Sequence, residues 1–79
     1  MKNNPEKCDL ILVFKTNLSC KEDVRKISGS LNSMEEIISW NVDLSDVDRV
    51  LRVESAQINT NKIIKLIIAA GYSCEELTD

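Results

Sequence analysis

Cys20 and Asp23 are the two side chains whose types and spacing could bind a metal ion, and both lie in the stretch NLSCKEDVRKI, residues 17–27. A cysteine thiolate is a soft ligand, whereas a carboxylate is a hard one. Residues three apart in a helix lie on the same face, so both side chains could reach one ion. The sequence has no histidine, the commonest metal ligand. The pair therefore supplies two ligands, fewer than the four that Zn²⁺ usually takes.

A helix start explains much of the same stretch without any metal. Ser19 and Glu22 form the S-x-x-E pattern of a capping box, in which each side chain accepts a hydrogen bond from the other residue's free backbone N–H. With Ser19 as the N-cap, Cys20 is the first helical residue, where the helix dipole and Lys21 favour the thiolate. Glu22 and Asp23 oppose this effect, so we expect a modestly activated, accessible thiol. The dipole alone also favours an acidic residue such as Asp23. Both interpretations of Asp23, as a ligand and as a helix-start residue, stay open.

The composition predicts one small globular domain and argues against several classes of function. Of the 79 residues, 43% are hydrophobic and 29% are charged, an ordinary balance for a soluble fold. The net charge is −3 with Lys and Arg dispersed, so no basic face predicts nucleic-acid binding. The N-terminal MKNNPEKCD lacks the apolar stretch of a secretory signal, and no apolar run is long enough to span a bilayer. We therefore expect a cytoplasmic protein without a nucleic-acid or membrane partner.

The three cysteines do not predict a disulfide framework, because their number is odd and no signal peptide precedes them. Cys8 precedes the first strand, at the end opposite the Cys20 loop, and is either a small buried hydrophobe or an exposed thiol. Cys74 lies towards the loop end, and we expect it to fill the core. A Cys20–Cys74 disulfide would need a short Cα separation. No cysteine has a visible base beside it and no Gly-rich phosphate loop is present, so we expect no enzyme.

Hydrophobic periodicity predicts six elements in the order βαββαβ. Alternating or continuous apolar residues predict strands over residues 9–16, 37–44, 49–55 and 72–77. Two split βαβ units of this kind make an antiparallel sheet with both helices on one face, an α+β fold. Residues 1–8 are then an N-terminal extension, and residues 9–77 form a single domain.

The spacing of apolar residues places the two helices. The first begins after Ser19 and ends at residues 32–33. The second begins at Asn59 or Thr60 and continues through Ala70. Gly71 follows it, at the position where a helix end needs a positive φ.

The second helix carries an unusually wide apolar surface. Its core side is predicted to consist of Ile63, Leu66, Ile67 and Ala70. Ile64 lies at the margin of this side, and Ile68 lies further round the helix. Single exposed apolar residues are normal on a small domain. The alternative is a partner-binding patch formed by Ile64, Ile68 and Ala69.

Several stretches together resemble the heavy-metal-associated domain of soluble copper chaperones and of the N-termini of metal-transporting ATPases. FKTNLSC is similar to the family's first strand and metal loop, IISWNVDL and VLRVES to its later strands, and IIKLIIAAGYSCEEL to its second helix and Gly-Tyr turn. The match covers about residues 9–77. It implies a ferredoxin-like sandwich with a four-stranded antiparallel sheet, strand order 4-1-3-2. It also implies an M-x-C-x-x-C loop whose two thiolates hold Cu(I) or a similar soft ion and hand it to a partner.

The resemblance assigns the loop positions of this chain with one departure. The family's Met position is Leu18, its first Cys is Cys20, its second Cys is Asp23, and the Tyr at the neighbouring turn is Tyr72. Ser19 also lies near the site. Because Asp23 replaces a soft ligand by a hard one, binding of Cu(I) or Zn(II) is expected to be weak or altered in preference.

Two functions are compatible with this resemblance. The first is a small soluble protein for metal-ion binding and trafficking, whose partner is a metal-transporting ATPase or another metal-trafficking protein. Two copies facing each other would then offer two Cys20 and two Asp23 side chains, a four-ligand site in a homodimer. The second is a metal-free protein–protein interaction module that keeps the fold but has lost the metal site, which the position of Ile68 favours.

Overall fold

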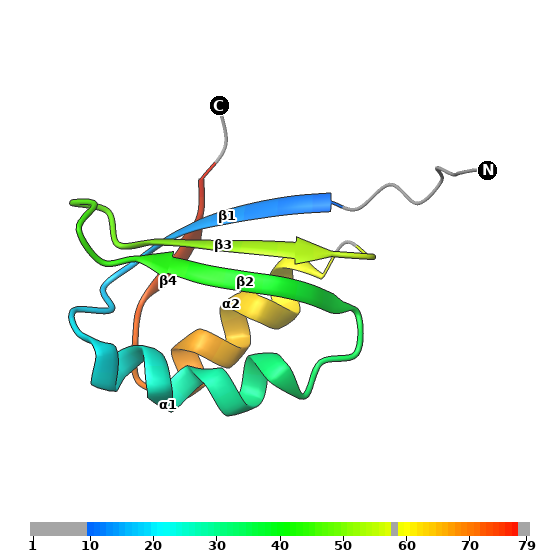
Figure 1. The fold of residues 1–79 in the computed structure, drawn as a ribbon, viewed down its shortest axis with the longest axis horizontal. Helices are drawn as coiled ribbons and strands as arrows, with labels where there is room; N and C mark the ends of the chain where they lie inside the picture. Colours follow the sequence, from blue (N-terminus) through cyan, green and yellow to red (C-terminus); the bar gives the residue numbers. More distant parts are fainter. Residues whose placement is uncertain (1–9, 58, 78–79) are drawn as a thin grey trace.

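The four strands and two helices follow one another in the predicted order in the computed structural model, which describes residues 10–57 and 59–77. The elements are β1 (Leu10–Thr16), α1 (Lys21–Asn32), β2 (Ile37–Asp43), β3 (Val50–Ser55), α2 (Thr60–Ala69) and β4 (Cys74–Glu76). The sheet order is β2-β3-β1-β4, which is the predicted 4-1-3-2 order read from the other edge. Figure 1 shows both helices on one face of the sheet. The predicted ferredoxin-like α+β fold is thus confirmed, while the predicted extension and Cys8 lie outside the described residues.

Strand β1 is the central strand on which the arrangement is built. It pairs antiparallel with β3 on one edge and with β4 on the other. Successive side chains of a strand point to opposite faces, so Phe14 is fully buried beneath the helices while Ile11 is 55% exposed on the open face. The buried side of β1 therefore continues into the loop that follows it, where Leu18 is buried as well.

The hydrophobic core lies between the sheet and the two helices. Its members are fully buried apolar side chains from β1, α1, β3, α2 and the loop after β1: Phe14, Leu18, Ile27, Leu31, Leu51, Val53, Ile63 and Ile67. A small domain buries a modest fraction of its surface, so each of these side chains contributes to stability. The loop residue Leu18 is part of this core, which anchors the loop before Cys20.

The start of α1 differs from the predicted capping box. Cys20 has extended φ and ψ values and is the N-cap, so it is not the first helical residue. Asp23, rather than Glu22, reaches back to the backbone N–H of Ser19. Glu22 instead lies 3.6 Å from Arg25 on the exposed face of the helix. The helix begins one residue later than predicted, which moves Asp23 to the third helical position, where the acidic side chain of a capping box stands.

The end of α2 is a Schellman motif with Gly71 at its centre, and the predicted positive φ at this glycine is confirmed. Gly71 has φ +102, its N–H donates to the carbonyl of Ile68, and the N–H of Tyr72 donates to the carbonyl of Ile67. Because Tyr72 belongs to this motif, β4 is shorter than the predicted strand over 72–77. The prediction that Ala70 faces the core is wrong, since it is the C-cap and is exposed.

The two glycines should respond to alanine in opposite directions. At neither glycine would an added Cβ meet another atom within 4 Å. Gly71→Ala forces a Cβ into the left-handed region and is expected to cost about 1 kcal/mol of unfolding free energy. Gly29→Ala, inside α1, is expected to stabilise by about 0.5–1 kcal/mol. Urea unfolding of both variants measures this, and stabilisation by Gly71→Ala would contradict the assigned turn.

Candidate metal-binding loop

The Cys20 loop, defined here as residues 17–20, lies between β1 and α1 at one end of the sheet (Figure 1). Leu18 is fully buried, so it fills the core and presents no side chain to a ligand. Two residues further on, Cys20 is exposed and its thiol is free. The loop therefore enters the core at Leu18 and is exposed again from Ser19 onward, so that the Cys20 thiol faces solvent.

The carboxylate of Asp23 is held by three hydrogen bonds. Its Oδ2 accepts from the backbone N–H of Ser19 at 2.9 Å and from the Ser19 hydroxyl at 2.8 Å. Its Oδ1 accepts from the hydroxyl of Tyr72 at 2.7 Å. We call these three residues the Asp23 clasp, because they join the Cys20 loop and α1 to the turn after α2. The fold thus brings Asp23 and Tyr72 together, although they are 49 residues apart in sequence.

The clasp shifts the protonation of both of its acidic groups. Hydrogen bonds from the backbone of Ser19, from Tyr72 and from the Ser19 hydroxyl hold the pKa of Asp23 well below its usual range. The same bond to the Asp23 carboxylate, with a smaller contribution from burial, raises the pKa of Tyr72 to about 12. Hydrogen bonding to the charged form of an acid favours that form. Asp23 is therefore an ionised acceptor and Tyr72 a neutral donor across the ordinary pH range.

Further contacts hold the loop on both sides. The side-chain oxygen of Asn17 accepts from the backbone N–H of Ser73 at 2.8 Å. On the opposite side, Arg49 donates from Nη1 to the carbonyls of Leu18 and Ser19, each at 3.2 Å. The sequence interpretation missed Asn17 and Arg49, because their partners are tens of residues away and no spacing pattern connects them.

The described residues offer few additional ligands for a metal ion. Within residues 10–57 and 59–77, no three Cys, Asp or Glu side chains form a group that could hold one. Cys74 is free, lies opposite Thr16 in the β1–β4 pairing and packs against the core. Its partial burial raises its pKa to about 11. These observations agree with the predicted core role of Cys74 and leave Cys20 as the exposed thiol.

The chain shares its fold with domains that bind copper. No protein-family model matches the sequence, and no curated protein is significantly similar to it. The yeast copper transporter domain Ccc2a, solved in apo and Cu(I)-loaded states, is 18% identical with a TM-score of 0.76, over 91% of this chain and 99% of that one. The copper(I)-loaded first domain of the human copper chaperone for SOD1, CCS, is 17% identical with a TM-score of 0.72, over 87% of this chain and 93% of that one.

A third solved neighbour is a protein complex. It is the Atx1–Cu(I)–Ccc2a complex, with 18% identity and a TM-score of 0.73, over 91% of this chain and 99% of the matched one. At these identities the likeness establishes the fold of the chain. The loop chemistry must therefore be argued from its own residues.

The hydrogen bond between Tyr72 and Asp23 can be tested by titrating Tyr72, because it is the single tyrosine of the chain. Tyr72 is expected to ionise near pH 12 rather than at its ordinary value of 10.0. The raised pKa means that the clasp stabilises the fold fully below pH 10 and loses this effect as the pH rises towards 12. Ultraviolet difference absorption at alkaline pH, with circular dichroism as a check on folding, measures the midpoint.

Asp23→Asn should lower that midpoint towards the ordinary value, because a neutral amide accepts the hydroxyl hydrogen bond less strongly than a carboxylate does. Asp46→Asn, in the turn between β2 and β3, is the matched control and should leave the midpoint unchanged. An equal midpoint in wild type and Asp23→Asn would show that the two side chains are not bonded in solution.

Proposed function

We propose that this protein binds a soft metal ion, Cu(I) in the first place, through the thiolate of Cys20 and passes it to another protein. The observation that carries the proposal is the exposed thiol at the N-cap of α1, on a fold shared with Cu(I)-loaded domains. Thiolates are the ligands that Cu(I) prefers.

Asp23 makes this binding weaker than binding by two thiolates. Its Oδ2 already accepts two hydrogen bonds and its Oδ1 accepts another. To coordinate an ion firmly, the carboxylate would have to exchange these donors for a soft cation that favours sulfur. Binding within one protomer is therefore weak, and Zn(II), which accepts mixed sulfur and oxygen ligands, is the second candidate ion.

A second thiolate from another molecule would complete the site. The exposed position of Cys20 allows a partner to approach it, and the Atx1–Cu(I)–Ccc2a complex is a case in which a domain of this fold takes part in an assembly with Cu(I). The partner we propose is a metal-trafficking protein such as a metal-transporting ATPase. A second copy of this chain, facing the first through the Cys20 loop, is the other source of the thiolate.

Cu(I) titration against a competing chelator tests this proposal, in a Cys8→Ser background that removes one competing thiol. Cys20→Ser should weaken Cu(I) binding by more than about tenfold, that is about 1.4 kcal/mol. Cys74→Ser is the matched control and should bind like the background protein, because Cys74 packs against the core. Asp23→Cys should tighten binding, since it restores a second soft ligand. Native mass spectrometry should show whether two chains share one ion.

The proposal fails if the background protein binds neither Cu(I) nor Zn(II) more tightly than micromolar affinity. It also fails if Cys20→Ser binds as well as its parent does. Asp23→Cys then serves as a positive control, because a binding variant shows that the assay detects a site in this loop.

A metal-free interaction module is the second candidate function. The Asp23 clasp favours it, because hydrogen bonds to Ser19 and Tyr72 close the loop without a cation. The proposed contact surface is the apolar patch on α2, where Ile68 is 54% exposed, Ala69 is exposed, and Ile64 is half-buried against the core.

This second function predicts that a partner is captured in the presence of a chelator. Ile68→Glu should abolish the capture, because it places a charge in the centre of the patch. Val47→Glu is the matched control, since Val47 is 89% exposed and lies in the turn between β2 and β3. Loss of capture with chelator alone, or equal capture by Ile68→Glu, would rule this function out.

A further inference from the structure

Arg49 adopts a backbone conformation that its side chain does not favour. It has φ +47 and is the only residue other than glycine with a positive φ among residues 10–57 and 59–77. A Cβ makes the left-handed region costly, and the positions that need it usually hold Gly or Asn. Such a strained residue persists where its surroundings require it, and an observed outlier is a reason to look for a role.

In this conformation the carbonyl of Arg49 lies against Thr16 at the end of β1, and its side chain lies against the Cys20 loop. Its carbonyl accepts from the Thr16 hydroxyl at 2.6 Å, and that hydroxyl accepts from the backbone N–H of Leu18 at 3.2 Å. Its Nη1 donates to the carbonyls of Leu18 and Ser19, each at 3.2 Å. These bonds form a closed ring between the turn after β2 and the two residues that precede Cys20. Glycine or asparagine could not form the guanidinium half of this ring.

The guanidinium of Arg49 makes its hydrogen bonds to the carbonyls of Leu18 and Ser19. In the described part of the chain, no carboxylate lies within ion-pair distance of Arg49. A planar guanidinium presents several donors in a fixed fork, so it can hold two acceptors in a set geometry, which a flexible ammonium does less well. The peptide groups of Leu18 and Ser19 set the direction in which the chain leaves the core. They therefore also determine where the Cys20 thiol lies.

We propose that Arg49 is the positioning residue of the Cys20 loop, fixing the backbone from which the Cys20 thiol is presented. The consequence for metal binding rests on the proposed function, but the ordering of the loop does not. Groups that hydrogen-bond directly to a metal ligand typically change metal affinity by about 10–100-fold when they are removed. Arg49 instead contacts the two residues before Cys20, so we expect an effect at the lower end of this range. Arg49 thus acts through the loop backbone and touches no metal ion itself.

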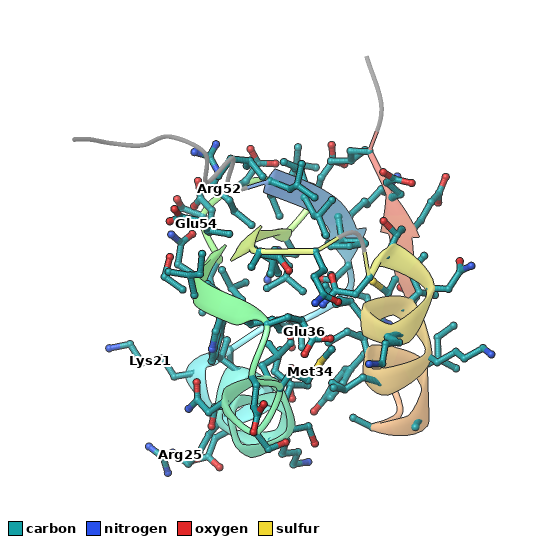
Figure 2. The ribbon with its side chains drawn as sticks, turned by 90° about the vertical axis from the view of Figure 1, so that its right-hand side faces the viewer. Lys21, Arg25, Met34, Glu36, Arg52 and Glu54 are labelled. Atoms are coloured by element: carbon teal, nitrogen blue, oxygen red, sulfur yellow. The ribbon has the colours of Figure 1, made fainter. Side chains whose placement is uncertain are left out.

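Three variants, made in a Cys8→Ser background, separate this role from a general effect on the fold. Arg49→Gly removes the guanidinium and relieves the strained φ, so the variant should unfold at the same or a higher urea concentration. Arg49→Lys keeps the charge but loses the fork. Arg52→Lys is the matched control, because Arg52 lies on β3 and, as Figure 2 shows, on the side of the sheet away from the helices.

Nuclear magnetic resonance relaxation of the backbone amides of Leu18, Ser19 and Cys20 is the first measurement. Order parameters near the rigid value of about 0.85 are expected in the parent and in Arg52→Lys, falling below about 0.6 in Arg49→Gly, with Arg49→Lys between them. The second measurement is Cu(I) affinity, which should fall about tenfold or more in Arg49→Gly and by less in Arg49→Lys.

Unchanged order parameters in Arg49→Gly would overturn the inference, as would disorder of the loop with unchanged Cu(I) affinity. If the parent protein binds no Cu(I), the proposed function fails by itself. The alkylation rate of the Cys20 thiol, measured in a Cys8→Ser, Cys74→Ser background, then tests whether Arg49 positions the thiol. A rate altered by Arg49→Gly but not by Arg52→Lys supports the positioning role, and equal rates overturn it.

Discussion

The burial of Leu18 is the constraint on which the rest of the site depends. This loop side chain is fully inside the core, and the two residues that follow it, Ser19 and Cys20, are exposed. The neighbouring turns then close on the loop from both sides, through Arg49 and through Tyr72. An exposed thiol on an ordered backbone is the result, and its position is set by packing more than by any property of the cysteine.

Asp23 stabilises the Cys20 loop by accepting hydrogen bonds, which a thiolate would accept only weakly. Two thiolates close together repel each other and accept hydrogen bonds weakly, so a cation between them relieves both problems. A carboxylate accepts strong hydrogen bonds, and here Ser19 and Tyr72 supply them. The clasp therefore satisfies the polar groups of the loop without a cation, and the Cys20 thiol stays exposed. This is the physical reason why the closed loop is compatible with both proposed functions, metal binding at Cys20 and a metal-free interaction through α2.

Solved domains that are less than 20% identical to this chain share its fold, so the sandwich does not depend on most of its individual residues. The core residues lie on the strands and helices, and their burial holds the fold whatever the exposed loop residues are. Binding residues are commonly found on loops positioned by such a scaffold, where they can change without loss of the fold. In this chain Asp23 stands beside such a loop, at the third position of α1, and the β1–loop–α1 connection is in place.

The sequence by itself determined the order of the elements, the alternation of buried and exposed residues along β2 and β3, and the Gly71 turn, because each follows from local periodicity or from one residue's backbone preference. The resemblance to heavy-metal-associated domains named Cys20 and Asp23 as candidate ligands, which stays a prediction. Only the tertiary structure decided that the helix starts one residue later, that Asp23 bonds to Tyr72, and that Arg49 holds the loop. Those partners lie 49 and about 30 residues apart. Their meeting depends on strand register and turn geometry, which no local pattern encodes.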